Sequence, residues 1–503
     1  MRNLALQVLF GTLVMARVPP LAYEQVPADP ASEIASALRA HQYQQAVKLA
    51  RSALERSPND VRILTMEAIA LSALDDDHDA LAAYNRALRL APDYLAALEG
   101  AAQIEYKSGS ERAIALLERL LKLRPNEPTA HAMRAVLAWK QGDCETAVRH
   151  FGLAGNAISS QAAALQEYGA CLARLQRPAQ AIPVFRQLTT LDPGDRRVRY
   201  RLAAAQFMAK AYGDAISTLG PLMEGKDADP NALDLASAAW EALGDTPRAV
   251  AALREAIVLA PTDTRFYVDF ASLCLVHKSF EVGIDMINAG LSRAPNAAPL
   301  YLARGVLNVQ LAQYDQADAD FAAAERLDPR QAYGSLARGL SQVQQNDFDK
   351  ALATVREQLK TRQKDEFLYY LLAEILTSQG AQVGSPEFQE AVAAASRAVQ
   401  LKPDFVLARD VLSRLYLESG QTDRAIEQCR LALRDSPSDT TALYRLIRAL
   451  QRSGKASDAE EIPALLKRFN EVRQQLRQQE AEEARYKLVE AGSPESDKSR
   501  SRR

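Results

Sequence analysis

The apolar residues of this chain follow a pattern that is typical of paired helices. Between Val61 and Tyr94 they recur every three or four positions, as on one face of a helix, in two segments of about 14 residues. A polar run, Asp75 to Asp79, separates the segments, and Pro92 ends the second one because proline disfavours helical geometry in the residue before it. The stretch is predicted to form a helical hairpin, whose apolar face needs neighbouring hairpins to cover it.

The same spacing recurs through most of the chain. With Val61 as position 1, small residues occupy positions 8, 20 and 27, an aromatic residue position 24 and proline position 32. Small residues allow two helix axes to come close, and bulky residues fill the sides. Thirteen such repeats begin at residues 27, 61, 95, 128, 162, 196, 230, 264, 298, 332, 366, 406 and 440, and the eleventh carries an insertion within residues 380–388. Six repeats have, directly after the first helix, a glycine that can end it in a left-handed conformation: Gly109, Gly142, Gly244, Gly380, Gly420 and Gly454.

This pattern resembles the tetratricopeptide repeat (TPR), in which 34 residues carry small, aromatic and proline residues at these places. In the second repeat the match consists of Ala68, Ala80, Tyr84 and Pro92, although Leu64 stands at position 4, where the family has tryptophan. The resemblance covers about nine-tenths of the chain. It implies an all-α fold, an α-solenoid of tandem helix-turn-helix repeats that forms a right-handed superhelix.

The resemblance also implies a general function. TPR proteins are usually non-enzymatic scaffolds that hold a peptide or a partner helix in the concave groove lined by their first helices. One subtype binds a C-terminal carboxylate with Lys at position 5 and Asn at position 9, but the second repeat has Thr65 and Ile69 there, and no other repeat restores the pair. We therefore expect a protein or peptide partner, and not a partner recognised in the manner of that subtype.

The N-terminal residues predict a secretion signal. Arg2 is followed by an apolar run from Leu4 to Ala16, which has the length of a signal-peptide core and is too short to cross a bilayer. Residues 1–22 are therefore predicted to be the signal peptide of an exported, periplasmic bacterial protein, with no transmembrane segment in the mature chain. If the run is not a signal, it is an uncleaved helix that caps the first repeat, and the protein is cytoplasmic.

The C-terminal residues predict a cap on the array. Residues 27–470 are assigned to the thirteen repeats, 471–490 to a charged capping helix and 491–503 to a polar, disordered tail. The spacing of four apolar residues suits them to cover the last repeat: Leu465, Phe469, Val472 and Leu476. A coiled-coil dimer arm is the alternative for this helix, but the apolar seam fades after Leu476. The oligomeric state does not follow from the sequence.

Charge argues against some partners, and the cysteine spacing leaves undecided whether any of the cysteines form a disulfide. The formal net charge of −2 gives no field that would attract nucleic acid or an anionic membrane. Apolar residues make up 48% of the chain, which is enough for a large core. Cys144, Cys171, Cys274 and Cys429 lack C-x-x-C spacing and are expected to fill small spaces in this core. A Cys144–Cys171 bridge between adjacent repeats is the alternative for an exported protein.

Candidate chemical motifs fail on their context. Gly220 to Lys226 has the spacing of a phosphate-binding loop, but it ends a helix, and Asp227 stands where Ser or Thr should hold magnesium. The run Asp75 to Asp79 could ligate a metal, yet acidic residues there also favour the start of the following helix. No ligand pair is expected among the other histidines, His41, His131, His150 and His277. No catalytic residue, metal site or cofactor is therefore predicted, and an enzyme with a site inside the superhelix is the least favoured class.

The predicted partner site lies on the first helices of repeats eight to eleven. Positions 2, 5, 9 and 12 of a first helix lie roughly 130° from the core positions 4, 8 and 11 and look into the groove. A groove that faces only water should be polar there, whereas exposed apolar patches usually mark interaction sites. The groove stripe, as we call this apolar set, consists of Val268, Leu275, Leu302, Val306, Val309, Tyr333, Leu336, Leu340, Val343, Phe367 and Tyr370.

Two alternatives to this site and function remain. Curvature of the array can let neighbouring helices cover the groove stripe, which would make it part of the core. The same surface can also be packed permanently on another protein, so that the chain is a non-catalytic structural subunit of a bacterial envelope assembly, secretion or polysaccharide-export machine.

Overall fold

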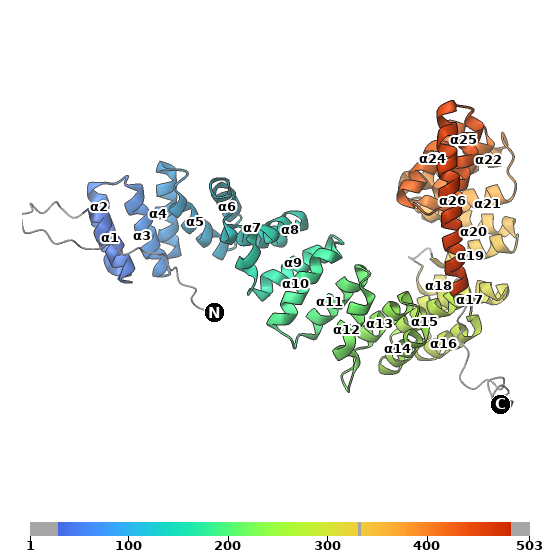
Figure 1. Ribbon diagram of the computed structural model, residues 1–503, viewed down its shortest axis with the longest axis horizontal. Helices are drawn as coiled ribbons and strands as arrows, with labels where there is room; N and C mark the ends of the chain where they lie inside the picture. The colour runs from blue at the N-terminus through green and yellow to red at the C-terminus, as the bar shows by residue number, and fades with distance from the viewer. Residues whose placement is uncertain (1–28, 330–332, 484–503) are drawn as a thin grey trace, which may run out of the picture. The chain divides into compact units, whose positions relative to one another are not determined.

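The protein is all-helical in the part of the chain that the computed structural model describes, residues 29–329 and 333–483 (Figure 1). These residues form 26 α-helices and one short 3-10 helix, η1 (Gly155–Ile158), and contain no β-strand. The chain divides into two compact units, Met1–Ala209 and Lys210–Arg503, called the N-terminal and C-terminal units below. The predicted all-α solenoid fold is confirmed.

The helices follow the predicted repeats. In eleven of the thirteen repeats the first helix begins at the residue predicted to open the repeat. The N-terminal unit contains α1 (Pro30–Arg39), α2 (Tyr43–Arg56), α3 (Val61–Ala73), α4 (Asp77–Leu90), α5 (Leu95–Lys107), α6 (Arg112–Leu123), α7 (Pro128–Lys140), α8 (Cys144–Ala154), α9 (Ala162–Arg174), α10 (Pro178–Leu191) and α11 (Arg196–Met208). The C-terminal unit contains α12 (Tyr212–Met223), α13 (Pro230–Ala242), α14 (Thr246–Leu259), α15 (Thr264–Val276), α16 (Phe280–Arg293), α17 (Ala298–Gln310), α18 (Tyr314–Leu327), α19 (Tyr333–Gln344), α20 (Phe348–Thr361), α21 (Glu366–Ser378), α22 (Pro386–Leu401), α23 (Val406–Glu418), α24 (Thr422–Asp435), α25 (Thr440–Ser453) and α26 (Ala456–Glu483).

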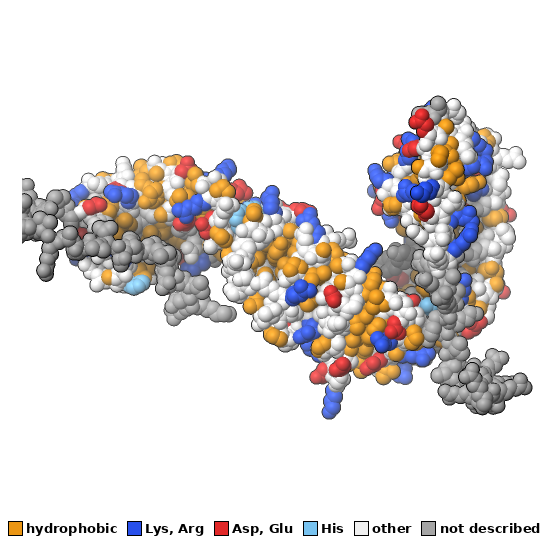
Figure 2. All heavy atoms as spheres, in the orientation of Figure 1, with side chains coloured by type: hydrophobic (Ala, Val, Ile, Leu, Met, Phe, Trp, Pro, Cys, Tyr) orange, Lys and Arg blue, Asp and Glu red, His pale blue; other side chains and the backbone are white. Residues whose placement is uncertain are grey.

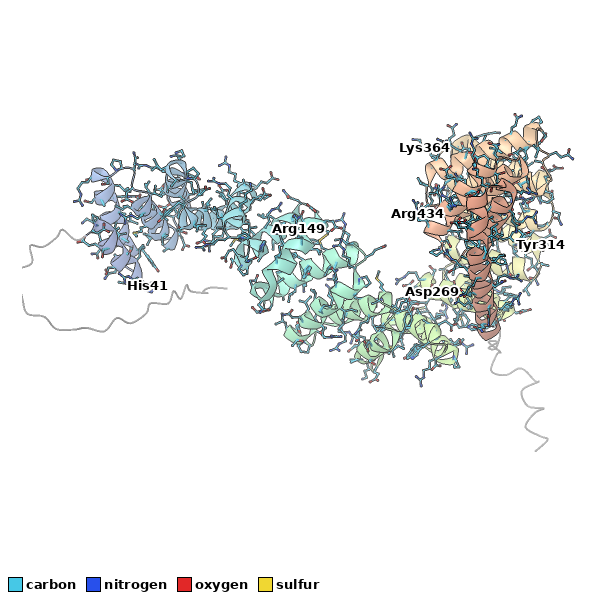
Figure 3. The ribbon with its side chains drawn as sticks, turned by 45° about the horizontal axis from the view of Figure 1, so that its top comes forward. His41, Arg149, Asp269, Tyr314, Lys364 and Arg434 are labelled. Carbon is cyan, nitrogen blue, oxygen red and sulfur yellow. A yellow bond between two sulfur atoms is a disulfide. The ribbon has the colours of Figure 1, made fainter. Side chains whose placement is uncertain are left out.

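The turn between the two helices of a repeat has the same backbone conformation throughout. The residue at position 15 has a positive φ in all thirteen repeats, including the six predicted glycines, for example Gly109 (75°) and Gly244 (78°). L-residues adopt this left-handed conformation at a cost. Seven repeats nevertheless place a side chain there: His41 (labelled in Figure 3), Asp75, Gln176, Lys210, Lys278, Ala312 and Asn346. Packing of the helices, and not glycine alone, therefore fixes the turn.

Aspartates set where many of the helices begin. Asp60 precedes α3 and accepts hydrogen bonds from the amides of Arg62 and Ile63, at 2.9 and 3.3 Å. Such bonds satisfy amides that have no partner inside the helix. In the polar run of the second repeat, Asp76 caps α4 by accepting from the amide of Asp79 at 3.3 Å. That run thus has the capping role that the sequence favoured. Later first helices are capped in the same way by Asp195, Asp229, Asp263, Asp365 and Asp439.

The close approach of the two helices in a repeat depends on small residues, as the spacing predicted. At position 20, alanines such as Ala80 and Ala249 are fully buried, whereas Ala459 of the last repeat is exposed. In the ninth repeat position 8 is Gly305, and a Cβ atom there would lie 2.4 Å from the ring of Phe321 at position 24. The aromatic ring thus occupies the space that a side chain at position 8 would need.

Helix α26 closes the C-terminal unit. It runs without a break through Pro463 and through the predicted boundary at residue 470, so the second helix of the last repeat and the cap are one helix. Phe469 and Val472 pack against the core of the last repeats as expected, with Leu465, whereas Leu476 is 41% exposed. Although α26 has 28 residues, neither it nor any other described helix is long and apolar enough to cross a membrane. The predicted signal peptide, the end of the cap from residue 484 and the tail lie outside the described residues.

The sequence that resembles a phosphate-binding loop, Gly220 to Lys226, begins in the last turn of a helix. Helix α12 ends at Met223, and the next helix begins only at Pro230. A phosphate-binding loop leads from a strand directly into a helix N-terminus. The structural context that such a loop requires is therefore absent from this described segment.

Candidate protein-binding surface

The first helices form the inner face of each unit. In the C-terminal unit α15 packs on α17, α17 on α19, α19 on α21, α21 on α23 and α23 on α25. In the N-terminal unit α1, α3 and α5 pack in this way, as do α7 and α9. Second helices of neighbouring repeats are not in comparable contact within the described ranges. The side of a stack on which the helices are closer is the inside of its curve, so the first helices line the inner face.

The structure gives the groove stripe a graded exposure. Leu275 on α15 and Leu340 on α19 are 36% and 39% exposed. Between them along the chain, α17 contributes Leu302, Val306 and Val309, which are half-buried. On the side of the molecule seen in Figure 2, apolar side chains likewise form patches between charged ones. Described helices leave this part of the stripe partly open to solvent.

Other members of the groove stripe are covered by neighbouring side chains. Phe367 and Tyr370 on α21 lie against Phe405, with ring centroids 4.8 and 5.4 Å apart. Val268 and Val343 are half-buried against the cores of their own repeats. The alternative that neighbours cover the stripe therefore fits these four residues better than Leu275 or Leu340. The remaining two members have side chains outside the described residues: Tyr333 and Leu336.

A buried ion pair holds α17 and its part of the stripe in position. Arg304 on α17 donates from Nη2 to Asp320 on α18 at 2.6 Å, and Asn308 donates to the other carboxylate oxygen at 3.0 Å. Asp320 is only 4% exposed. Hydrogen bonds between charged groups are roughly twice as strong as neutral ones, so this network rigidly fixes α17 on α18.

Three further apolar side chains occupy groove positions in repeats where the sequence analysis did not place the site. Ile69 on α3 is 40% exposed, Leu407 on α23 is 51% exposed and Tyr444 on α25 is 49% exposed. They stand at positions 9, 2 and 5 of their repeats. Their positions predict that they face the groove, but each stands apart from the run of apolar residues in repeats eight to eleven by which the groove stripe was recognised.

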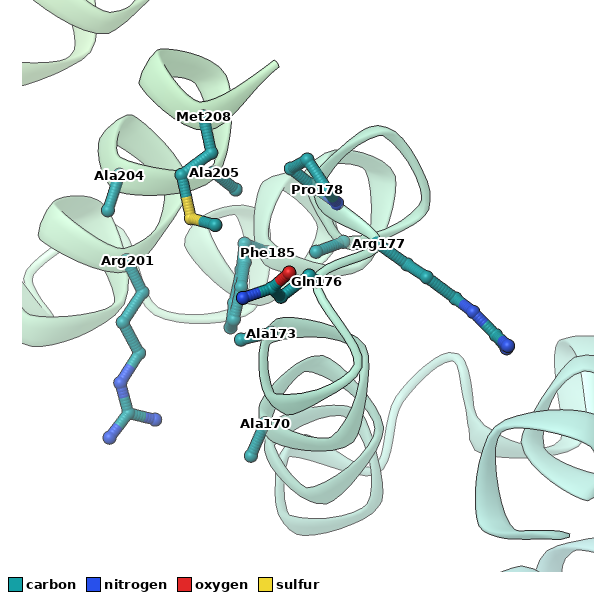
Figure 4. Close-up of a pocket in the computed structure, with 11 residues that line it drawn as sticks. Ala170, Ala173, Gln176, Arg177, Pro178, Phe185, Arg201, Ala204, Ala205 and Met208 are labelled. Carbon is teal, nitrogen blue, oxygen red and sulfur yellow. The ribbon is translucent and has the colours of Figure 1, made fainter. Parts of the chain in front are cut away.

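The N-terminal unit has a cavity on its inner side, between α9, α10 and α11 (Figure 4). Its volume is about 310 Å³, and the ring of Phe185 lies in its wall. Ala170 and Ala204 stand at position 9 of their repeats, so the cavity opens at groove positions. The first helices α9 and α11 are packed less closely than α7 and α9, and the small side chains of Ala170, Ala173 and Ala204 do not fill the space between them.

Two carboxylates near the inner face have raised pKa values. Burial raises the pKa of Asp410 on α23 to about 7, and the charge of Asp439 adds to the effect. Burial likewise raises the pKa of Asp234 on α13 to about 6, with repulsion from Asp269 on α15, which Figure 3 labels. In an apolar setting the charged form of a carboxylate is disfavoured. These groups therefore change charge within or near the neutral range.

The buried His277 of the eighth repeat contacts two side chains of the seventh repeat. Its Nε2 lies 2.8 Å from a carboxylate oxygen of Glu241 and 3.3 Å from the hydroxyl of Thr246. These contacts tie repeats seven and eight together.

The structure brings two histidines together, contrary to the expectation that they form no pair. His131 and His150 both belong to the fourth repeat, and their Nδ1 atoms are 2.9 Å apart. Nε2 of His131 lies 2.8 Å from the carbonyl oxygen of Pro125, so it carries the proton and Nδ1 accepts from His150. Burial and the neighbouring His131 lower the pKa of His150 to about 4. Within the described residues no third metal-ligating side chain joins them.

The structure joins two of the four cysteines. Cys144 at the start of α8 and Cys171 in α9 form a disulfide, with Cα atoms 5.0 Å apart. Both side chains are buried at the contact between repeats four and five. Cys274 and Cys429 are buried thiols, as expected for core fillers. The bridge, which the sequence left open as an alternative, therefore links two adjacent repeats covalently.

An array of helical hairpins with its first helices on the inner face defines a helical-repeat solenoid of the protein-interaction class. Family models for the tetratricopeptide repeat match residues 34–94, 106–163, 172–239, 302–366, 381–440 and 411–466, more than half of the chain. The chain belongs to the tetratricopeptide repeat family.

The individual proteins that resemble this chain share little sequence identity with it. The chain is 25% identical over 301 residues to Superkiller protein 3 of Schizosaccharomyces pombe, and the alignment covers 58% of this chain but only 19% of that protein. The crystal structure of yeast Tom70 matches 88% of this chain and 99% of its own, with 16% identity and a TM-score of 0.46. A tetratricopeptide repeat protein from Parabacteroides merdae matches 57% of this chain and 98% of its own, with 13% identity and a TM-score of 0.39. These scores are low, so the family assignment depends on the repeat models.

Proposed function

We propose that the protein is a non-enzymatic scaffold that binds a peptide or helix of a partner protein on the inner face of the C-terminal unit. The observation that supports this function is the exposure of Leu275 and Leu340 on either side of the half-buried residues of α17. Each aliphatic side chain that becomes buried against a partner contributes up to about 1.5 to 3 kcal/mol before the costs of ordering. The ion pair of Arg304 keeps the surface in one arrangement, which lowers those costs.

The test is a double substitution on the exposed part of the stripe. Leu275→Ser with Leu340→Ser should reduce partner capture from an extract of the source organism by at least tenfold, measured by quantitative mass spectrometry. The substitutions should leave the melting curve nearly unchanged, because both side chains are more than a third exposed.

A matched control lies on second helices of the same unit. Leu259 and Leu327 are 43% and 40% exposed, so Leu259→Ser with Leu327→Ser removes the same kind of surface from the other side of the hairpins. The control should capture as much partner as the wild type. Equal loss in both variants would show that general surface hydrophobicity, and not the groove stripe, holds the partner.

We further propose that the scaffold works in an oxidising compartment outside the cytoplasm. The Cys144–Cys171 disulfide supports this location, because disulfides persist in exported proteins and are rare in reducing compartments. The apolar run from Leu4 to Ala16 is the segment that would direct export. In a bacterium the compartment would be the periplasm, where a permanent place in an envelope assembly is the alternative to reversible binding.

A further inference from the structure

The cavity in the N-terminal unit is apolar inside and open to solvent. Ala170 and Ala173 come from α9, Phe185 from α10, and Ala204 and Met208 from α11. Figure 4 shows the ring of Phe185 between α9 and α11, with the side chain of Met208 above it. Met208 is 52% exposed, so part of its side chain is in contact with solvent at the mouth of the cavity. A volume of about 310 Å³ is at the small end for ligand sites and suits one large side chain with the backbone on either side of it.

The edge of the cavity carries a cation without a partner. The guanidinium of Arg201 on α11 makes no hydrogen bond or ion pair with the residues that the structure describes, although it lines the cavity. The other lining arginine, Arg177, is occupied by the two carboxylate oxygens of Glu145 at 2.8 and 2.9 Å. Of the two arginines that line the cavity, Arg201 is therefore the one whose charge is not already paired.

We propose that this cavity binds a leucine or phenylalanine side chain of an acidic segment of another protein, with a carboxylate of that segment paired to Arg201. The apolar wall takes the side chain out of water, and the free guanidinium selects the negative charge beside it. The site lies within the N-terminal unit and does not depend on the surface proposed above. A ligand of this cavity differs from a ligand of the groove stripe. It must carry a large apolar side chain and a carboxylate close together, whereas the stripe requires only apolar side chains.

The methionine methyl groups provide a direct readout. Among the methionines in the described part of the chain, Met208 is the one that lines the cavity, so its carbon-13 methyl resonance in the full chain reports on occupation. The Met208→Leu variant assigns this signal, and the methyl groups of Met66, Met133 and Met223 serve as internal controls. The probes are the peptide acetyl-Gly-Ser-Leu-Glu-Glu-Ser-Gly-amide, a form with alanine in place of leucine, and a form with lysine in place of both glutamates.

The leucine peptide with two glutamates should shift the Met208 signal to saturation and leave the other methionines unchanged. The alanine form should bind about tenfold or more weakly, because the apolar anchor is lost. The lysine form should bind at least about two- to fivefold more weakly, the usual value of an exposed ion pair. A Met208 signal that stays fixed up to the solubility limit of the peptide would overturn the proposal, as would equal binding of the lysine form.

Two variants locate the interaction. Ala204→Leu should fill the cavity and abolish the shift, with the helical circular dichroism of the wild type. Arg201→Gln, on the exposed rim, should keep the fold and bind the glutamate and lysine peptides equally. If Ala204→Leu loses helical structure, the binding data of Arg201→Gln alone show whether the proposed site is correct. Wild-type discrimination in Arg201→Gln, or full binding by folded Ala204→Leu, would contradict the proposed site.

Discussion

Asp410 links the stability of the last repeats to pH. It lies on α23, is 9% exposed, and has Nη1 of Arg445 at 3.6 Å from its Oδ1. This cation favours the charged form, but burial and the charges of Asp439 and Glu374 act in the opposite direction and raise the pKa to about 7. The carboxylate is therefore protonated in the folded chain at pH values where it is ionised in the unfolded chain.

The sign of the pH dependence follows from this shift. The folded pKa of about 7 is above the ordinary value of 3.8, so the contribution to stability is complete below pH 4 and is lost as the pH rises through 7. The loss amounts to up to about 4 kcal/mol, since each pKa unit corresponds to about 1.4 kcal/mol. Asp410→Asn should therefore flatten the decline in stability of repeats eleven to thirteen between about pH 4 and pH 7, measured by hydrogen exchange. The control is Asp423→Asn on α24, an exposed position, which should keep the wild-type slope. An equal slope in wild type and Asp410→Asn would show that Asp410 is not the responsible group.

At the scale of the helical hairpin, the left-handed turn is a place where the chain is strained. Ala312 has a φ of 56°, and an alanine in this conformation costs roughly 1 to 2 kcal/mol. Glycine removes this cost but loses about 0.5 to 1 kcal/mol through the greater freedom of the unfolded chain. Ala312→Gly should therefore stabilise the ninth repeat by up to about 1 kcal/mol, seen as slower hydrogen exchange in α17 and α18.

Asn346→Gly is the matched control for this turn. Asn346 has a φ of 58° at the same position of the tenth repeat, and asparagine adopts the left-handed conformation more readily than alanine. Its gain should be smaller than that of Ala312→Gly. A gain of the same size or larger would mean that relief of backbone strain does not explain the effect.

The elements of this fold could be predicted from the sequence because they depend on local spacing. First helices begin at Val61, Leu95 and Thr440 as the repeat pattern required, and position 15 is left-handed whether or not it is glycine. The exposure of the groove stripe could not be predicted in the same way. It depends on how side chains distant along the chain meet, as when Phe405, the last residue of the eleventh repeat, covers Phe367 near its start.

Contacts between residues far apart in the pattern were also missed for a physical reason. The position numbers of His131 and His150, 4 and 23, say nothing about how two side chains meet across a hairpin. The cavity beside Arg201 depends on the distance between α9 and α11, which small residues permit but do not determine. The distance between the first helices of two neighbouring repeats therefore comes from the structure and not from the sequence pattern.

At the scale of the whole molecule, the disulfide and the N-terminal run make one joint prediction. Alkylation of the unfolded, unreduced chain from its native compartment should modify Cys274 and Cys429 only, because Cys144 and Cys171 are joined. The mature N-terminus should lie between residues 17 and 27. Replacing both bridged cysteines by alanine should destabilise repeats four and five by about 3.5 kcal/mol, as expected for closing a loop of this length. Four modified cysteines on a chain that still begins with Met1 would contradict export.

The bridge between α8 and α9 also has a mechanical consequence. The cysteines are separated by 27 positions, and a fully extended segment of that length would span roughly 90 Å. When the chain is pulled from its two ends, this length stays hidden, because the load passes through the two sulfur atoms and bypasses the segment between them. Repeats on either side can still separate and unravel under tension. The part of the fourth and fifth repeats between the two cysteines then acts as a covalent link of fixed length, and a reductant would release the hidden length and make the molecule longer under the same force.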